Sequence, residues 1–175
     1  MDASAAGPPT PESPADNPFF EELLWVHGML RRDLDAVSRL AVDVADGMAG
    51  AELRAELAEL KANGPLWRLK VNCLTYCRFV HRHHRAEDVL LFPNLVRIDP
   101  ALAPVAERLE RDHRRVAELL GQTEAAARAL AEDESQPARR RVVAALDELG
   151  GHLLEHLAFE ERSLKAPMSR LDGLR

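Results

Sequence analysis

Four histidines occupy positions on apolar helical stripes where a leucine would otherwise be expected. Each lies in a different stretch of helical periodicity, and two of them are followed four residues later by a glutamate. This spacing places an imidazole and a carboxylate on one helix face, about one turn apart. The residues are His27, His83, Glu87, His113, His156 and Glu160. Side chains of these two kinds can approach one centre and bind a metal ion there.

A single histidine on an apolar stripe is more often a hydrogen-bonded core residue than a metal ligand. Two buried glutamates change this balance, because an unpaired buried carboxylate is costly unless it is paired or binds a metal. Mixed imidazole and carboxylate donors suit Fe, Mn or Zn, whereas a structural zinc site would need converging thiolates. Two carboxylates can each bridge a pair of ions, so the pattern favours two metals over a single zinc. A metal-free polar core that only fixes the register of the helices is the alternative.

The apolar residues around these histidines recur at alternating steps of three and four, which predicts four amphipathic helices. We expect the first helix to begin at Asn17, the second at Pro65 and the third near Ala101. Ser135 and Pro137 mark the turn before the fourth helix. No stretch shows the alternation of a strand. The fold class is therefore all-α.

Glycines and prolines separate the helices. Gly47 and Gly50 close the first helix, and residues 51–62 are predicted to form a short acidic helical connector. Pro93 and Pro100 are predicted to end the second helix. Short connections of this kind favour an antiparallel up-down four-helix bundle with a short extra helix between its first two helices.

An up-down bundle brings the four histidines to one level. His27 lies roughly 10 residues after its helix start and His83 roughly 10 before its helix end, which is about 15 Å from the same end of the bundle. His113 and His156 lie ~15 to 18 Å from that end by the same count. All four imidazoles should converge on one layer.

Two further histidines are ambiguous. His84, with Asp88, forms a competing register about 100° around the helix from His83 and Glu87. Only the latter pair continues the apolar stripe, so we interpret His84 as a surface residue, a support for the ligands or an additional ligand. His152 lies one turn before the histidine of the fourth stripe and is either a fifth ligand or a residue that orients one.

Other residues near the stripes are interpreted as structural. Glu161 and Asp112 each neighbour an expected ligand and are interpreted as surface carboxylates in preference to supports for that ligand. Trp25 and Trp67 are interpreted as packing anchors near the ends of their helices.

The composition predicts one domain between two tails. Residues 1–16 are rich in Pro, Ala and Ser, which is typical of a disordered segment. Residues 17–168 form the bundle, and residues 169–175 a C-terminal tail. Cys73 and Cys77 lie one helical turn apart, fit small core positions and are too few for a disulfide framework.

Charge and hydropathy exclude several classes of protein. The 29 acidic and 23 basic side chains give a net charge of −6, which argues against a general nucleic-acid binder. The N-terminus lacks the basic and apolar regions of a signal peptide, and no apolar run reaches the ~18 residues of a membrane span. We expect a cytoplasmic protein that binds neither nucleic acid nor membrane.

The sequence resembles the hemerythrin-like, or HHE cation-binding, domains over roughly residues 18–168. The matching segments are VHGMLRRDL around His27, HHRAEDVLLFP with His83 and Glu87, ERDHRRV around His113, and HLLEHLAFEE with His156 and Glu160. The resemblance implies a non-haem diiron centre, bridged by carboxylates and an oxo or hydroxo group, that meets O2, NO or peroxide. Mn or Zn are the alternative occupants.

The chain departs from the oxygen-carrying hemerythrins at two places. These carriers have two histidines four residues apart on the third helix, where this chain has His113 followed by Ala117. They have His-x4-Asp on the fourth helix, where this chain has His156 and Glu160. Fewer nitrogen ligands would leave more coordination positions open, which favours redox turnover, sensing or iron handling over O2 storage.

Three functions follow from these observations. The first is a diiron protein that binds O2 or NO for sensing, buffering or iron homeostasis. The second is a small diiron redox enzyme that disproportionates peroxide or oxidises ferrous iron, with a redox partner that the sequence does not name. The third is a metal-free helical scaffold.

Overall fold

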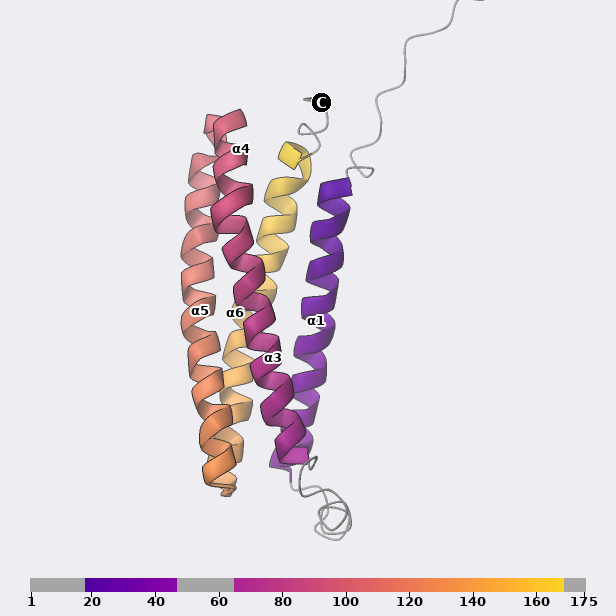
Figure 1. The fold of residues 1–175 in the computed structure, drawn as a ribbon, viewed down its shortest axis with the longest axis vertical. Coiled ribbons are helices and arrows are strands. Elements are labelled where there is room, and N and C mark those ends of the chain that lie inside the picture. Colours follow the sequence, from indigo (N-terminus) through magenta and orange to yellow (C-terminus); the bar gives the residue numbers. More distant parts are fainter. Residues whose placement is uncertain (1–17, 47–64, 169–175) are drawn as a thin grey trace, which may run out of the picture.

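Long helices run side by side along one axis in the computed structural model, which describes residues 18–46 and 65–168 (Figure 1). The long helices are α1 (Pro18–Ala45), α3 (Pro65–Ala86), α5 (Ala103–Glu132) and α6 (Gln136–Met168). Successive long helices run in opposite directions. Helices α1 and α5 each pack against both α3 and α6. The described residues contain no strand, and the architecture is the predicted all-α up-down bundle.

The helix that starts at Pro65 does not end at Pro93. It continues beyond α3 through a π-helical turn, η2 (Glu87–Leu91), into α4 (Phe92–Ile98). The N–H of Phe92 donates to the carbonyl of Glu87, five residues earlier. Pro93 lies in the first turn of α4, directly after the π-helical turn, so its missing N–H falls where the α-helical hydrogen-bond pattern is already interrupted. The prediction that Pro93 ends the helix was therefore wrong.

The second predicted stop is confirmed. The helix ends at Ile98, and Asp99 is extended, as expected for a residue before a proline. Pro100 then begins a single 3-10 turn, η3 (Pro100–Leu102), which leads into α5.

The core consists of two apolar clusters at different heights along the bundle. The smaller cluster includes Phe20, Phe92 and Leu109, and the larger includes Leu34 and Leu120. On α1, on α5 and between α3 and α4, a histidine lies between the residues of the two clusters, and on α6 Glu160 lies between them. The polar layer therefore interrupts an otherwise continuous apolar core, where unsatisfied polar groups are costly.

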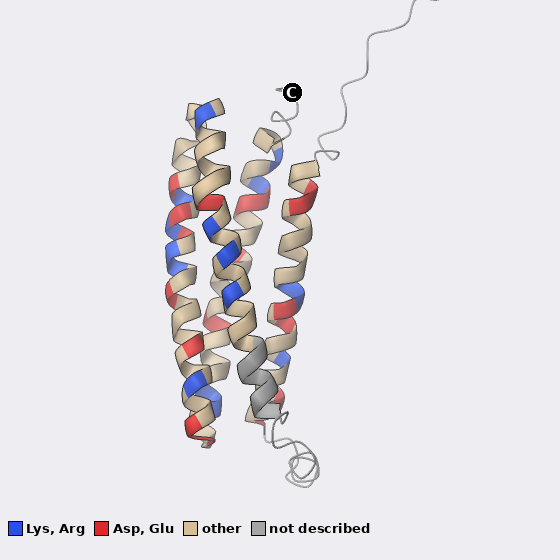
Figure 2. Ribbon diagram, viewed as in Figure 1, with Lys and Arg blue, Asp and Glu red and all other residues tan. Residues whose placement is uncertain are grey.

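The surface of the described helices carries charges of both signs. Figure 2 shows acidic and basic residues interspersed along the bundle. Trp25 is 63 % exposed, because it lies off the buried stripe of α1, so its interpretation as a packing anchor was wrong. None of the described helices is both long and apolar enough to cross a membrane.

Several sequence predictions fall outside the described residues. These are the tails at 1–16 and 169–175, the connector at 51–62 and the glycine stop at Gly47 and Gly50. The side chain of Trp67 is likewise not described.

Candidate metal centre

Two groups of possible metal ligands lie in the polar layer. We call them the three-histidine group (His84, His113 and His156) and the mixed group (His27, His83, Glu87 and Glu160). Within each group, one ligand atom from every residue lies within 4.8 Å of the others. All of these residues are buried except His83, which is slightly more exposed. The six residues predicted from the sequence therefore converge, together with His84.

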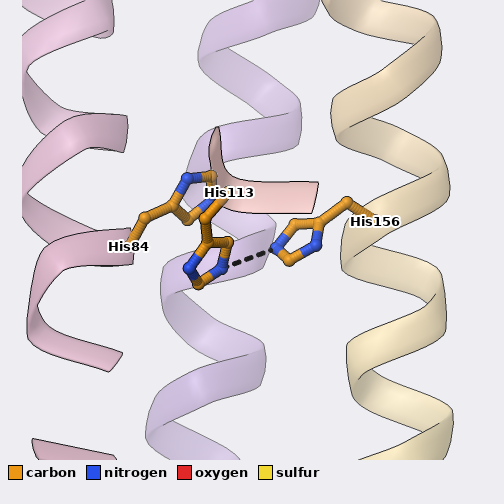
Figure 3. A group of neighbouring side chains, drawn as sticks. All are labelled: His84, His113 and His156. Carbon is orange, nitrogen blue, oxygen red and sulfur yellow. Dashed lines mark hydrogen bonds between the residues drawn. The ribbon is translucent and has the colours of Figure 1, made fainter. Parts of the chain in front are cut away.

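The three-histidine group joins α3, α5 and α6 (Figure 3). The Nε2 atoms of His113 and His156 are 3.1 Å apart, so that one ring can donate to the other. The His84 ring stacks on His113 with a centroid distance of 4.0 Å and an interplanar angle of 8°. His84 also meets His156 edge-on at 5.0 Å. Three imidazoles from three helices thus surround one small volume.

The two glutamates of the mixed group also approach the three-histidine group. Glu87 Oε1 is 3.2 Å from His83 Nε2, while Glu87 Oε2 is 3.5 Å from His113 Nε2. Glu160 Oε2 is 3.5 Å from His27 Nε2 and 3.5 Å from His156 Nε2. Each carboxylate therefore approaches one imidazole of each group, which is the arrangement that a bridging ligand requires.

The layer is rich in buried polar atoms without hydrogen-bond partners. Among the described residues, every such side-chain atom except the Tyr76 hydroxyl belongs to this layer. They include both oxygens of Glu87, both oxygens of Glu160 and the Nε2 atoms of His27, His83 and His84. Folded proteins leave few buried polar groups unsatisfied. These residues fit bound cations, because a cation would satisfy the lone pairs that the protein leaves without partners.

Burial changes the protonation of these ligands. It lowers the pKa of His83, His113 and His156 to about 3, and neighbouring imidazoles act in the same direction. Burial raises the pKa of Glu87 well above its usual value, and the charge of Glu160 adds to the effect. Neutral imidazoles keep a lone pair for a metal. Buried carboxylates, in contrast, pay a desolvation cost that a cation would offset.

Carboxylates on the outer side of the layer hold two of the imidazoles. Asp88 Oδ1 accepts from His113 Nδ1 at 2.7 Å, and Glu161 Oε1 accepts from His27 Nδ1 at 2.9 Å. Arg31 also donates to Glu161 Oε1 at 2.7 Å. Burial raises the pKa of Glu161, but the hydrogen bonds from Arg31 and His27 outweigh this effect and hold the pKa below its usual value. A carboxylate on Nδ1 fixes the ring and leaves Nε2 for a metal.

The structure changes the interpretation of Glu161 and Asp88. Glu161 was interpreted as a surface carboxylate, but it is only partly exposed and is bonded to His27. Asp88 does not replace Glu87 as the inward-facing carboxylate. Its side chain accepts a hydrogen bond from His113, while Glu87 faces the interior of the bundle. The sequence signal for both was present, because each directly follows a glutamate of the inward stripe.

His84 is 5 % exposed, so of its alternative interpretations the surface position was wrong. Because α3 lies between α1 and α5, two successive residues both reach the interior. His83 meets His27 of α1, and His84 stacks on His113 of α5. The layer therefore offers five imidazoles. The expectation that this chain has fewer nitrogen ligands than the oxygen-carrying hemerythrins does not hold for the geometry of the layer. The His83–His84 doublet was the signal that could have indicated this.

His152 is exposed and belongs to neither group. It lines a cavity of 130 Å³ together with Arg108, Glu155 and His156. The Nδ1 atom of His156 has no hydrogen-bond partner among the described residues. The cavity is large enough for water, which can connect His156 to these polar side chains.

Replacing His84 with alanine should weaken metal binding, whereas replacing His81 should not. His81 lies one turn earlier on α3 and is exposed. Removing a residue that hydrogen-bonds to a ligating histidine typically lowers metal affinity by about 10–100-fold. The loss of one of the three imidazoles should lower the affinity at least as much. Metal titration of both variants, monitored by inductively coupled plasma analysis of the retained ion, measures the difference. Equal retention in the two variants would remove His84 from the ligand set.

The metal-free protein should lose stability as the pH falls below about 6.5. In the folded state, burial holds the pKa of His83, His113 and His156 at about 3, below the ordinary value of 6.5. Between these values the unfolded chain binds more protons, so the free energy of unfolding decreases as pH is lowered. The raised pKa values of Glu87 and Glu160 act oppositely, because stability is lost as pH rises through them. Because three such imidazoles oppose two carboxylates, we expect the effect of the imidazoles on the free energy of unfolding to be the larger one.

Urea unfolding of chelated protein at several pH values measures this dependence. The free energy of unfolding should change more steeply with pH below about pH 6.5 than above it. A higher free energy of unfolding at about pH 5 than at about pH 6.5 would contradict the assigned burial of neutral imidazoles.

The fold and the site together define a helical-bundle protein whose buried histidines and glutamates can hold cations. The chain belongs to the hemerythrin HHE cation-binding domain family, which it matches over residues 18–168. Comparisons with curated proteins and with solved structures found no match.

Proposed function

We propose that the protein binds two non-haem irons and uses them to bind O2 or NO for sensing, buffering or iron homeostasis. The observation that carries this proposal is the sharing of Glu87 and Glu160 between two groups of imidazoles. One ion would be held by the three-histidine group and the other by the mixed group. Both carboxylates, with an oxo or hydroxo group, would bridge the pair.

Iron is proposed over Mn or Zn on the donor set and the family. Five imidazoles and two carboxylates form a mixed nitrogen and oxygen environment, which suits iron. Cys73 and Cys77 lie within the larger apolar cluster and are not in either ligand group, so no thiolate site for structural zinc arises there. When bound, two irons supply an open coordination position and a redox couple.

The protein's own residues would prepare this site in three ways. Asp88 and Glu161 orient His113 and His27 through their Nδ1 atoms. The apolar clusters on either side of the layer limit the entry of water. Burial keeps His83, His113 and His156 neutral and therefore able to bind a metal.

The second candidate is a small diiron redox enzyme that disproportionates peroxide or oxidises ferrous iron. The polar cavity that His152 and Glu155 share with His156 favours this alternative. Redox turnover of peroxide requires groups that transfer protons near the reacting centre. His152 and Glu155 are titratable groups at that place.

One set of measurements tests these functions. Iron-loaded protein is exposed separately to O2, NO and peroxide, while its absorption spectrum and peroxide consumption are recorded. A stable spectral change with O2 or NO and little peroxide consumption supports the binding function, and steady consumption supports the enzyme. A Glu87→Gln, Glu160→Gln double variant is the control. Wild-type protein that retains no more iron than this control would favour the metal-free scaffold.

A further inference from the structure

The two carboxylates on the outer side of the layer differ in their own partners. Glu161 Oε1 accepts from His27 Nδ1 at 2.9 Å and also from Arg31 Nη1 at 2.7 Å. Among the described residues, Asp88 accepts no hydrogen bond from an arginine, and the charge of Arg114 acts on it only through space. A single oxygen of Glu161 therefore joins a guanidinium group to an imidazole of the polar layer.

We propose that Arg31 is a positioning residue of the metal centre, which holds Glu161 against His27 and thereby keeps the imidazole directed at the bound ion. The effect on an ion rests on the proposed function, whereas the two hydrogen bonds do not depend on one. Arg31 does not contact the metal in this arrangement. It acts through the carboxylate, and on the ion of the mixed group, to which His27 belongs.

The positions of these residues on α1 and α6 suit this role. Arg31 lies one turn after His27, so both side chains project from the same face of α1. Glu161 reaches this face from α6, directly after Glu160, which faces the layer. The ring of His27 is bonded through Nδ1, while its Nε2 lies 3.5 Å from Glu160 Oε2. An acceptor that is itself held in place therefore fixes the face of the ring that a metal would use.

The imidazole alone does not account for the position of Glu161. The side chain of Glu161 is 23 % exposed, and burial by itself raises its pKa, so the charged carboxylate favours water over this site. The hydrogen bond from Arg31 is the largest of the effects that lower this pKa, ahead of the hydrogen bond from His27. Without Arg31, the carboxylate should turn toward solvent and leave the ring unsupported.

An ion pair that only clamps α1 to α6 is the alternative. The side chain of Arg31 is 35 % exposed, and ion pairs near the surface contribute little to stability. A clamp would change the stability of the metal-free protein without changing the His27 imidazole. The two roles can therefore be separated by experiment.

The chain offers a matched control at the next position. Arg32 follows Arg31 on α1, is exposed and is not a partner of Glu161. Arg31→Met and Arg32→Met each remove one positive charge and keep an unbranched side chain. Arg31→Lys retains a charged donor and serves as the rescue. Glu161→Ala provides a background in which Arg31 has no carboxylate to hold.

The first measurement is the titration of Fe²⁺ against a chromophoric chelator in the absence of O2. Arg31→Met should weaken one of the two ions by about tenfold, the lower end of the loss caused by removing partners of ligating histidines. Arg32→Met should bind iron as the wild-type protein does, and Arg31→Lys should recover most of the loss. In the Glu161→Ala background, Arg31→Met should cause no further loss, because a residue that acts through Glu161 has no effect without it.

The second measurement needs no metal. In chelated protein with ¹⁵N-labelled histidine, the Nδ1 proton of His27 should exchange slowly with water, because the ring is buried and donates to Glu161. The same slow exchange is expected in Arg32→Met. Arg31→Met should make this proton exchange faster or remove its signal. Urea unfolding of the same chelated samples measures the contribution of a clamp.

Equal iron affinity and equal exchange of the His27 proton in Arg31→Met and Arg32→Met would overturn the proposal. A further loss of iron when Arg31→Met is added to Glu161→Ala would also overturn it, since Arg31 would then act independently of Glu161. A lower free energy of unfolding as the sole effect of Arg31→Met would assign Arg31 to the clamp. A protein that binds no iron, but in which Arg31→Met speeds the exchange of the His27 proton, would refute the proposed function and keep the role of Arg31.

Discussion

Replacing Glu87 or Glu160 with glutamine is expected to cause the largest loss of bound iron of any single substitution in the layer. Each carboxylate lies within 3.5 Å of an imidazole nitrogen in both ligand groups. Removing one charge would therefore affect both of the proposed ions at once. A neutral amide also supplies less of the negative charge that balances two cations in a buried site.

The neighbouring carboxylates provide matched controls. Asp88→Asn and Glu161→Gln remove the same charge one residue later in the sequence, where each carboxylate contacts the Nδ1 atom of one imidazole, and Glu161 also accepts from Arg31. These two variants should lose about 10–100-fold in metal affinity, as outer partners of ligating histidines do. Glu87→Gln and Glu160→Gln should lose more. Equal losses in all four variants would show that the inward register is wrongly assigned.

The same substitutions should separate metal binding from folding. Without metal, burial raises the pKa of Glu87 and Glu160, because a charged carboxylate in this layer pays a desolvation cost. Glutamine has nearly the same shape and does not carry that charge. Chelated Glu160→Gln should therefore be at least as stable to urea as chelated wild-type protein. Loss of both iron and stability would instead indicate a folding defect.

Chelation of iron from the wild-type protein should lower its melting temperature substantially. A ligand that binds only the folded state contributes stability by mass action, about 2.7 kcal/mol at 100 times its Kd and about 4.1 at 1,000 times. For a chain of this size these values correspond to a shift of about 5–15 °C. The carboxylate oxygens of Glu87 and Glu160 have no hydrogen-bond partners without metal, and satisfying them is part of the binding free energy that this shift reports.

The chelated protein should nevertheless stay helical at low temperature. Apolar clusters lie on both sides of the layer, and neither depends on a metal. This distinguishes the bundle from a small zinc domain that has no core of its own. Circular dichroism melting of iron-loaded and chelated samples at the same pH and protein concentration measures both expectations. Identical melting curves, in samples with different measured iron contents, would place the iron outside the bundle.

The helical architecture and most of the candidate site can be predicted from the sequence. Apolar residues at steps of three and four predict which face of each helix is buried, and this property is local to each helix. A histidine at such a step, as at His27 or His113, must then face the core. Antiparallel helices of similar length bring these histidines to one level, so that helix rise alone predicts their convergence.

Which neighbouring residues also face the interior depends on how the helices pack together. Periodicity assigns one residue per turn to a stripe, but α3 contacts both α1 and α5, so His83 and His84 face the layer from adjacent positions. The roles of Asp88 and Glu161 depend on imidazoles of other helices, which no local pattern specifies.

The π-helical turn and an apolar cavity beside it were likewise decided in three dimensions. Pro93 was predicted to end a helix, yet the chain continues through the turn that begins at Glu87. The cavity forms between the first turns of α1 and this segment, which are far apart in the sequence. An exposed residue such as Leu90 lines this cavity only because another helix lies opposite it. Sequence periodicity reports burial within one helix, whereas a cavity depends on the shape that two helices leave between them.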